Sequence, residues 1–441
     1  MAIDTDYAHQ MAMQLATYEV QGTQTRLQRS QSNYQAQRDA LNSLRSALST
    51  FASSVRGLKT GGAGMLVNRA TFSAEGYATA TVGTNAAEGR YQFYVKQLAS
   101  AHQVALEGLT PEKIGTAGTL TLTQGGESFT IDLAAIDSDG DDSNSLEELA
   151  KAINGHADNT GVRASLVRAD GQVLLVLSAE QSGEDAAIGV SVSGTNADFA
   201  AAVAARRELS AARNAEVYLG GQDGIKLTSA SNRFDNIIDG VSLTFTKAHE
   251  SPDQTLTIEI SRDESATKGK AQSFIDAFNT LMTTIDKLTA SGGETSSRGT
   301  LAGDSTVSTL ENRLNQLLRT SFGGVSLIDF GISADRNGKL TIDTARFEKA
   351  LAANPEGFEK LFTGKDNLID SLDKLLTSYT SSADGLLKNR IDSLDMSLKR
   401  VREQSDALQL QYESYYNRYL RQYTTMLQTM EAMQQTLSMF G

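Results

Sequence analysis

The spacing of apolar residues in the last 56 residues of the chain, 386–441, constrains the fold more than any other feature. These residues follow one another at steps of three and four, which is the pattern of a coiled-coil seam. The seam contains Leu387, Ile391, Leu394, Leu398, Val401, Ser405, Leu408, Tyr412, Tyr415, Tyr419, Tyr423, Met426, Met430, Met433, Leu437 and Phe440. At about 1.5 Å per residue, the segment predicts a helix of about 85 Å that needs a partner helix.

The first 58 residues contain a matching partner. The same spacing is kept by Leu41, Leu44, Leu48, Phe51, Val55 and Leu58, whereas upstream only Val20, Leu27 and Tyr34 supply one apolar residue per heptad. A row of glutamines runs beside them: Gln21, Gln24, Gln28, Gln31 and Gln35. We expect the two ends to pair as an antiparallel stalk. Its upstream part is weak as an isolated pair, because buried amides need hydrogen-bond partners.

Two interpretations of this stalk stay open. One is an ordinary buried helix pair. The other is an assembly surface, which is favoured by the polar upstream seam and by tyrosines and methionines, residues that suit adaptable interfaces. The candidate residues of that surface are Leu27, Tyr34, Leu41, Leu48, Leu408, Tyr412, Tyr415, Tyr419, Tyr423, Met426, Met430, Met433 and Leu437.

Between the terminal segments the hydrophobic period changes to two, which is typical of strands. Strands are predicted at 91–95, 241–245 and 256–260, with the last two forming a hairpin, and another hairpin is predicted at 162–177. Helical spacing returns at 265–289. The fold class is therefore α+β and multidomain, with long antiparallel terminal helices as a coiled-coil stalk and nested, inserted β-rich domains.

This order of elements predicts four parts. They are terminal helical legs, a helical or mixed domain at the base of the stalk, a β-rich domain and a second β-rich domain inserted in the first. Their expected bounds are 1–39 with 401–441, 40–69 with 265–400, 70–108 with 213–264, and 109–212.

Charge and composition exclude several classes of function. The net charge is −13, and residues 1–58 and 386–441 each carry +1, so the middle carries −15. An acidic body without basic clusters argues against nucleic-acid binding. The chain has no cysteine, which excludes disulfides and thiol nucleophiles. We find no run of about 18 apolar residues and no secretory signal, so we expect no membrane insertion.

No pattern of catalytic residues stands out, and we expect neither an enzyme nor a cofactor. The four histidines are far apart and lack metal-ligand spacing. The segment DSDGDDSNSLEE places Asp137, Asp139, Asp141 and Glu148 at four ligand positions of a calcium loop, but Asp142 stands where the loop requires glycine. The favoured alternative is an acidic turn in which Ser145 begins a helix, with no metal.

Several stretches resemble a known family, the flagellar hook-associated protein 2 family of filament cap proteins. The resemblance covers most of the chain. It is carried by LQRSQSNYQAQRDALNSLRSALSTF near the start, LTSASNRFDNIIDGVSLTF at 227–245 and the closing YNRYLRQYTTMLQTMEAMQQTLSMF. In addition, SLEELAKAINGHADNTGVRASLV is similar to the flagellin and hook IN repeat, which is named after a pair that matches Ile153 and Asn154 here.

The resemblance implies a homo-oligomeric ring at the tip of an extracellular flagellum, where flagellin folds and polymerises. The terminal helices would be legs that engage the filament. Implied partners are flagellin, the hook-filament junction proteins and an export chaperone at the C-terminal helix. Export would use the flagellar type III apparatus without a cleaved signal peptide. The alternative is a surface adhesin that binds host glycan or protein through its exposed central domains.

Overall fold

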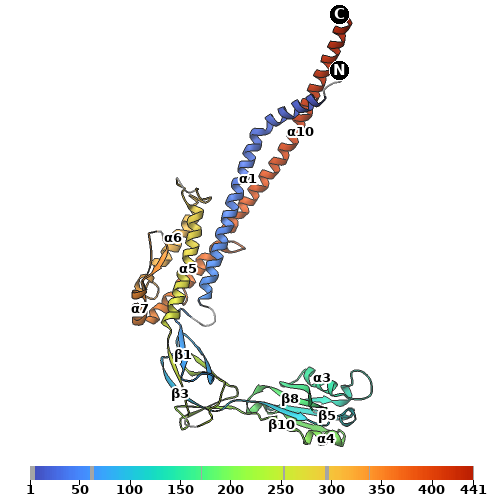
Figure 1. Cartoon of the computed structure of the whole chain (residues 1–441), viewed down its shortest axis with the longest axis vertical. Coiled ribbons are helices and arrows are strands. Elements are labelled where there is room, and N and C mark those ends of the chain that lie inside the picture. Colours follow the sequence, from blue (N-terminus) through green and yellow to red (C-terminus); the bar gives the residue numbers. More distant parts are fainter. Residues whose placement is uncertain are drawn as a thin grey trace. The chain divides into compact units, whose positions relative to one another are not determined.

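The structure is a computed structural model (Figure 1). It describes residues 5–59, 64–169, 171–251, 254–293, 297–336 and 338–440. The chain divides into two compact units. The first, here called the stalk unit, comprises residues 1–66 and 264–441, and the second, the inserted unit, comprises 67–263. Asp170, in the turn of the hairpin predicted at 162–177, lies outside the described residues.

The stalk unit is largely helical. Its helices are α1 (Thr5–Gly57), α5 (Glu264–Thr289), α6 (Ser305–Arg319), α7 (Thr344–Ala353), α8 (Pro355–Phe362), α9 (Leu368–Thr380) and α10 (Leu386–Phe440). A two-stranded sheet of β16 (Ile332–Ala334) and β17 (Leu340–Ile342) follows the 3-10 helix η4 (Leu327–Phe330). The long terminal helices α1 and α10 and the helix predicted at 265–289 are confirmed.

One hydrophobic core holds the base of the stalk unit together. It collects the second half of α1, the start of α10, and residues of α5 to α9. Four of its buried phenylalanines form a cluster: Phe358 contacts Phe330, Phe347 and Phe362 at ring-centroid distances of 5.1, 5.4 and 5.1 Å. Burial of such rings supplies much of the hydrophobic stabilisation of a domain.

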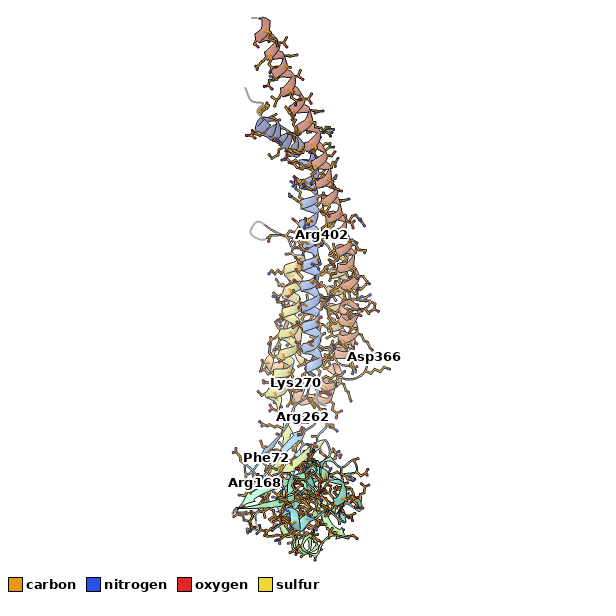
Figure 2. All side chains as sticks on the ribbon, turned by 90° about the vertical axis from the view of Figure 1, so that its right-hand side faces the viewer. Phe72, Arg168, Arg262, Lys270, Asp366 and Arg402 are labelled. Carbon is orange, nitrogen blue, oxygen red and sulfur yellow. The ribbon has the colours of Figure 1, made fainter. Side chains whose placement is uncertain are left out.

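Side chains of the stalk unit also hold the segment that leads out of it. The amide of Leu66 donates to the Glu359 carboxylate at 2.7 Å. Lys270 of α5, labelled in Figure 2, donates to the carbonyl oxygen of Gly64. Burial lowers the pKa of Lys270. Met65 and Leu66 are buried in the core described above, so the last residues before the inserted unit have fixed positions.

The inserted unit consists mainly of antiparallel sheets. Its strands are β1 (Asn68–Phe72), β2 (Ala78–Val82), β3 (Gly89–Gln97), β4 (Ala101–Leu106), β5 (Thr119–Gln124), β6 (Glu127–Asp132), β7 (Val162–Ala169), β8 (Gln172–Ser182), β9 (Gly189–Ser193), β10 (Arg207–Ser210), β11 (Ala215–Leu219), β12 (Ile225–Ser229), β13 (Arg233–Ile238), β14 (Val241–Phe245) and β15 (Leu256–Arg262). The sheet orders are β1-β15-β3-β11-β12, β13-β14-β2, β10-β4-β8-β7 and β6-β5-β9. The unit also contains the helices α2 (Pro111–Ile114), α3 (Leu146–Gly155) and α4 (Ala197–Ala204) and the 3-10 helices η2 (Leu133–Ala135) and η3 (Glu184–Ala186).

The inserted unit has two separate hydrophobic cores, one under the sheets of β1 and β13, the other under those of β4 and β5. The hairpin predicted at 162–177 is confirmed by the pairing of β7 with β8. The hairpin predicted from 241–245 and 256–260 is wrong, because β14 pairs with β13 and β2 while β15 pairs with β1 and β3. The two strands instead contribute buried side chains to one core from different sheets.

Candidate assembly surface on the terminal helices

Helices α1 and α10 lie side by side along the stalk unit (Figures 1 and 2). At the base their seam is fully buried, since Leu387, Ile391, Leu394, Leu398 and Val401 are at most 8 % exposed. Leu41 and Leu48 of α1 are 2 % and 0 % exposed. These two candidate residues are therefore covered within the single chain, as members of the core at the base. Tyr34 is half-buried and packs against the same core.

Further along the helices, the seam contains a gap. A half-open pocket of about 660 Å³ lies there, lined by Thr17, Val20, Gln24, Leu27, Gln28 and Gln31 of α1 and by Ser405, Asp406, Leu408, Gln409 and Tyr412 of α10. Three glutamines of the row described above, Gln24, Gln28 and Gln31, line this space together with Ser405. Leu27 is buried, whereas Leu408 and Tyr412 are half-buried.

Beyond the gap, toward the start of α1, the buried side of α1 is formed by alanines. Ala8, Ala12 and Ala16 follow one another at steps of four and are 2 %, 0 % and 0 % exposed. In this part of the stalk unit α10 runs along α1, and its side chains here include large tyrosine rings. Small side chains let a neighbouring helix approach closely. These alanines were missed because the sequence analysis followed large apolar residues only. A repeat of small residues every fourth position was the available signal.

The tyrosine hydroxyls form polar contacts that bridge the two helices. Tyr419 donates to the Glu19 carboxylate at 2.7 Å, and this hydrogen bond raises the pKa of Tyr419. The Arg418 guanidinium lies over both the Tyr415 and Tyr419 rings, 4.9 and 4.7 Å from their centroids. Tyrosine suits this place because its ring packs while its hydroxyl bonds to a neighbour.

Two further contacts extend this link toward the start of α1. The Tyr416 hydroxyl and His9 Nδ1 are 2.7 Å apart. Tyr7 packs edge-on against Tyr423, with ring centroids 6.4 Å apart. Of the candidate tyrosines of α10, Tyr419 and Tyr423 therefore contact α1 directly, and Tyr415 is tied to Tyr419 through Arg418.

The last part of α10 is uncovered, and it runs past the start of α1 (Figure 1). Met426, Met430, Met433 and Leu437 are 42 %, 52 %, 62 % and 72 % exposed. A shallow groove of about 630 Å³ lies along Met426, Met430 and Met433. Arg421, Gln422, Thr425 and Thr429 also line it. Of the candidate residues, the three methionines and Leu437 are the ones that the single chain leaves most open.

Replacing Ala12 by leucine should loosen α1 from α10. Because Ala12 is fully buried, the larger side chain must push the helices apart, at a cost of about 1–3 kcal/mol. Hydrogen–deuterium exchange should then become faster for the amides of residues 5–20. Ala36→Leu on the same helix is the matched control, since Ala36 is exposed. Equal exchange in the two variants would contradict the tight seam.

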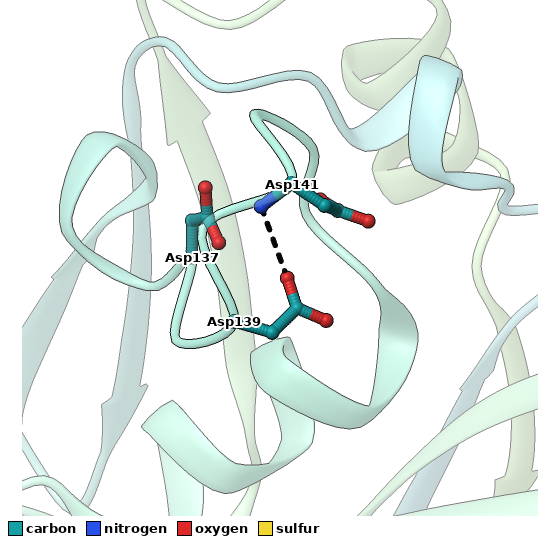
Figure 3. A group of neighbouring side chains, drawn as sticks. All are labelled: Asp137, Asp139 and Asp141. Carbon is teal, nitrogen blue, oxygen red and sulfur yellow. Dashed lines mark hydrogen bonds between the residues drawn. The ribbon is translucent and has the colours of Figure 1, made fainter.

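The acidic loop of the inserted unit is a hydrogen-bonded turn. Asp137, Asp139 and Asp141 each bring a carboxylate oxygen within 4.8 Å of the others (Figure 3). Asp137 accepts from the amide of Gly140 at 2.7 Å and Asp139 from that of Asp141 at 3.2 Å. These bonds shape the turn. Calcium binding at this loop stays a hypothesis.

Glu148, the fourth residue of the calcium pattern, has a different task. Together with Ser145 it forms the capping box of α3, which confirms the helix start predicted there. The backbone amides of Ser145 and Ser138 donate to its carboxylate at 3.0 and 2.6 Å. These hydrogen bonds lower the pKa of Glu148 to about 2. Both carboxylate oxygens are thus engaged in holding the loop onto the helix.

Because the pKa of Glu148 is lowered, we expect the stability of the fold to decrease in acid. A carboxylate with a folded-state pKa near 2 stabilises the fold above its ordinary pKa of 4.5, and this contribution is lost as the pH falls from 4.5 toward 2. Glu148→Gln should lower the thermal midpoint by about 2–4 °C at pH 7, because a glutamine side chain has only one oxygen that can accept hydrogen bonds. The thermal midpoint of this variant should also fall less between pH 4.5 and pH 2 than that of the wild type. Thermal unfolding from pH 7 to 2 measures this. Glu147→Gln is an exposed control, and identical curves for the two variants would refute the argument.

The pair Ile153 and Asn154 connects α3 to the neighbouring sheet. Ile153 is fully buried. The Asn154 side chain donates to the carbonyl oxygen of Ala164 and accepts from its amide, both at 2.8 Å. An asparagine is suited to this role because one amide group pairs with both backbone groups of a strand residue. The pair is therefore a structural joint between α3 and β7.

No segment of the described helices combines the length and hydropathy that crossing a bilayer requires. Three family models match the chain. They describe the flagellar hook-associated protein 2 C-terminus at residues 212–435, its N-terminus at 4–102, and the flagellin hook IN motif at 119–180.

The chain is 38 % identical to the lateral flagellar hook-associated protein 2 of Vibrio parahaemolyticus, over 98 % of both chains. It is 30 % identical to the A-type flagellar hook-associated protein 2 of Pseudomonas aeruginosa, over 83 % of this chain and 80 % of the relative. Among solved structures, it is similar to the D1-D2-D3 domains of the flagellar cap protein FliD from Escherichia coli. That similarity has a TM-score of 0.66 at 26 % identity, and covers 81 % of this chain and 99 % of the other.

Proposed function

Because the chain belongs to the flagellar hook-associated protein 2 family, whose members cap the flagellar filament, we propose that it works as a homo-oligomeric ring at the filament tip. There it promotes the folding and polymerisation of exported flagellin, and thereby filament elongation and motility. The observation that carries this proposal is similarity to a cap protein over the stalk and inserted units together.

The terminal helices are the parts that engage the filament. The exposed end of α10 offers a helical seam that the described residues of the chain leave uncovered, and such seams bind other helices. The distribution of charge between the two units agrees with this role of the terminal helices. The stalk unit contains 26 basic and 26 acidic residues and is neutral, whereas the inserted unit contains 14 basic and 27 acidic residues, a balance of −13. A neutral stalk approaches neighbouring helices without electrostatic repulsion.

Further partners follow from the family. We propose contacts with hook-filament junction proteins during assembly, and an export chaperone that covers the C-terminal helix before secretion. Export would use the flagellar type III apparatus without a cleaved signal peptide, and the protein would act outside the cell. The relatives are structural cap proteins, and we propose no catalytic role. The alternative of an adhesin gains no support from the comparisons.

A deletion strain tests the proposal. Without the cap, flagellin should leave the cell as monomer and accumulate in the culture medium, and filaments should be absent by electron microscopy. Expression of the full chain should restore both filaments and motility. Filaments of normal length in the deletion strain, combined with lost surface attachment, would contradict the cap and indicate an adhesin.

The ring has its own test. Light scattering over a concentration series gives the mass of the full chain and of a chain shortened to residues 40–400. A ring-sized mass that needs the ends would show that the terminal helices drive assembly. If the shortened chain assembles equally well, other surfaces hold the ring together. A monomer at every concentration, for the full chain as well, would contradict a ring that forms by itself.

A further inference from the structure

Residues 246–251, which follow β14, are attached to the inserted unit through His249. This residue is 9 % exposed, and its backbone amide donates to the carbonyl oxygen of Val95 in β3 at 2.8 Å. In return, the amide of Val95 donates to Nδ1 of the His249 side chain at 2.9 Å. The pairing of β15 with β3 ends at Phe93, which lies opposite Leu256. His249 therefore takes the place of a neighbouring strand at Val95.

Two tyrosine rings also pack against the imidazole of His249. Tyr77, in the connection between β1 and β2, stacks on it with ring centroids 4.7 Å apart. Tyr94 of β3 stacks on it with centroids 5.6 Å apart. The carbonyl oxygen of Tyr77 accepts from the amide of Thr246 at 2.8 Å. The segment is therefore tied both to β3 and to the connection that precedes β2.

Protonation of His249 is incompatible with its hydrogen bond to β3. A ring nitrogen that accepts from an amide must be unprotonated, so the imidazole is neutral and its hydrogen is on Nε2. A proton added to Nδ1 would face the N–H of Val95, and this hydrogen bond would be lost. The faces of tyrosine rings attract cations, but they give Nδ1 no substitute for the lost bond. The attached segment therefore holds His249 in its neutral form.

The surroundings of His249 act in the same direction. Burial lowers the pKa of His249, and the positive charge of Lys247 lowers it further. Lys247 lies 5.1 Å from the centroid of the Tyr77 ring, and its ammonium group is 3.9 Å from the Glu250 carboxylate. That carboxylate is thus engaged with Lys247. Lys247 itself and the two tyrosines offer a protonated His249 no carboxylate as a partner.

We propose that acid releases residues 246–251 from β3 while the sheets of the inserted unit stay folded. Strands β14 and β15 lie before and after the segment in the chain, and each is paired with two other strands, so its release leaves both in place. The neutral imidazole favours the attached segment above the ordinary pKa of 6.5, and this advantage is lost as the pH falls below that value. The inference is independent of the proposed cap ring, because all of these contacts lie within residues 67–263.

Hydrogen–deuterium exchange of the full chain tests the release at the amide of Val95. His249→Asn is the informative variant, because Oδ1 of asparagine takes the place of Nδ1, accepts from Val95 and does not titrate. Comparing both proteins at the same pH cancels the effect of pH on the exchange chemistry. At about pH 7.5 the two rates should be similar. At about pH 5 we expect at least about fivefold faster exchange in the wild type, since release becomes about tenfold more favourable for each pH unit below 6.5.

His156→Asn is the matched control. His156 is a half-buried histidine of the same unit, and its Nδ1 accepts from the amide of Asp158 at 3.1 Å. This control should keep the acid-dependent rise at Val95. Equal rates in the wild type and His249→Asn at both pH values would overturn the inference.

A second comparison separates local release from unfolding. In the wild type alone, protection of the Val95 amide, corrected for the exchange chemistry, should fall between about pH 7.5 and about pH 5, while that of β14 and β15 stays constant. This comparison also decides the matter if His249→Asn does not fold. Unchanged protection at Val95 would overturn the release, and an equal loss across β14 and β15 would overturn its local character.

Discussion

Replacing both Tyr415 and Tyr419 by aspartate is expected to abolish filament growth. The change removes the hydroxyl of Tyr419 that donates to Glu19 and both rings that hold the Arg418 guanidinium. It also puts two carboxylates on a half-buried seam, where desolvated charge is costly. The terminal helices should separate near their ends, and they could then no longer engage the filament. Filament length by electron microscopy and motility in soft agar measure the result.

The control for this variant carries the same added charge on the other side of the helix. Ser414→Asp together with Asn417→Asp adds two carboxylates at exposed positions of the same turns of α10. This control should keep filament growth near the wild-type level. Circular dichroism should show that the sheets of the inserted unit are intact in both variants. Wild-type motility of the Tyr415→Asp/Tyr419→Asp chain would refute the role assigned to the tyrosines.

The largest loss of stability is expected from Phe358→Ala. Phe358 is fully buried and contacts three other phenylalanine rings, Phe330, Phe347 and Phe362. Truncation leaves a cavity among them and should lower the free energy of unfolding of the stalk unit by about 3–5 kcal/mol. Because the bases of α1 and α10 share this core, the variant should also impair capping. Urea unfolding followed by circular dichroism gives the free energy.

Met396→Ala is the comparison for this substitution. Met396 lies on α10 in the same unit but is 62 % exposed, so its truncation should change stability by less than about 0.5 kcal/mol. The inserted unit should unfold at the same urea concentration in both variants. A Phe358→Ala chain as stable as Met396→Ala would mean that the phenylalanine cluster does not stabilise the core.

The sequence was sufficient for local structure wherever one period extended over many residues. The 3–4 spacing predicted α1, α5 and α10, and alternation predicted β3, β14 and β15. Strand pairing was the weak point, as the hairpin predicted from 241–245 and 256–260 shows. Alternation says which side of a strand is buried, but not which strand lies beside it. Val241 and Leu256 are both buried in one core while their strands belong to different sheets.

The candidate assembly surface shows a second limit of prediction from the sequence, which is that spacing does not reveal exposure. Leu41 and Met430 have the same place in a 3–4 pattern, yet Leu41 is 2 % exposed and Met430 is 52 % exposed. Leu41 belongs to a core in which α5 and α9 pack against α1, and this packing depends on the tertiary structure. The alanines at 8, 12 and 16 were missed for the opposite reason, because a small residue carries little hydrophobic signal although it decides how closely two helices approach.

The inserted unit begins and ends on neighbouring strands, and this has a consequence for how such chains can change. Asn68 of β1 is directly opposite Arg262 of β15, so the entry and exit of the unit are held together by its own sheet. In the chain, nearly two hundred residues are inserted between α1 and α5, which belong to the same unit. Any domain with equally close termini fits the same junction. The inserted unit can therefore be exchanged or redesigned as a module, while the helical part keeps its sequence and its fold.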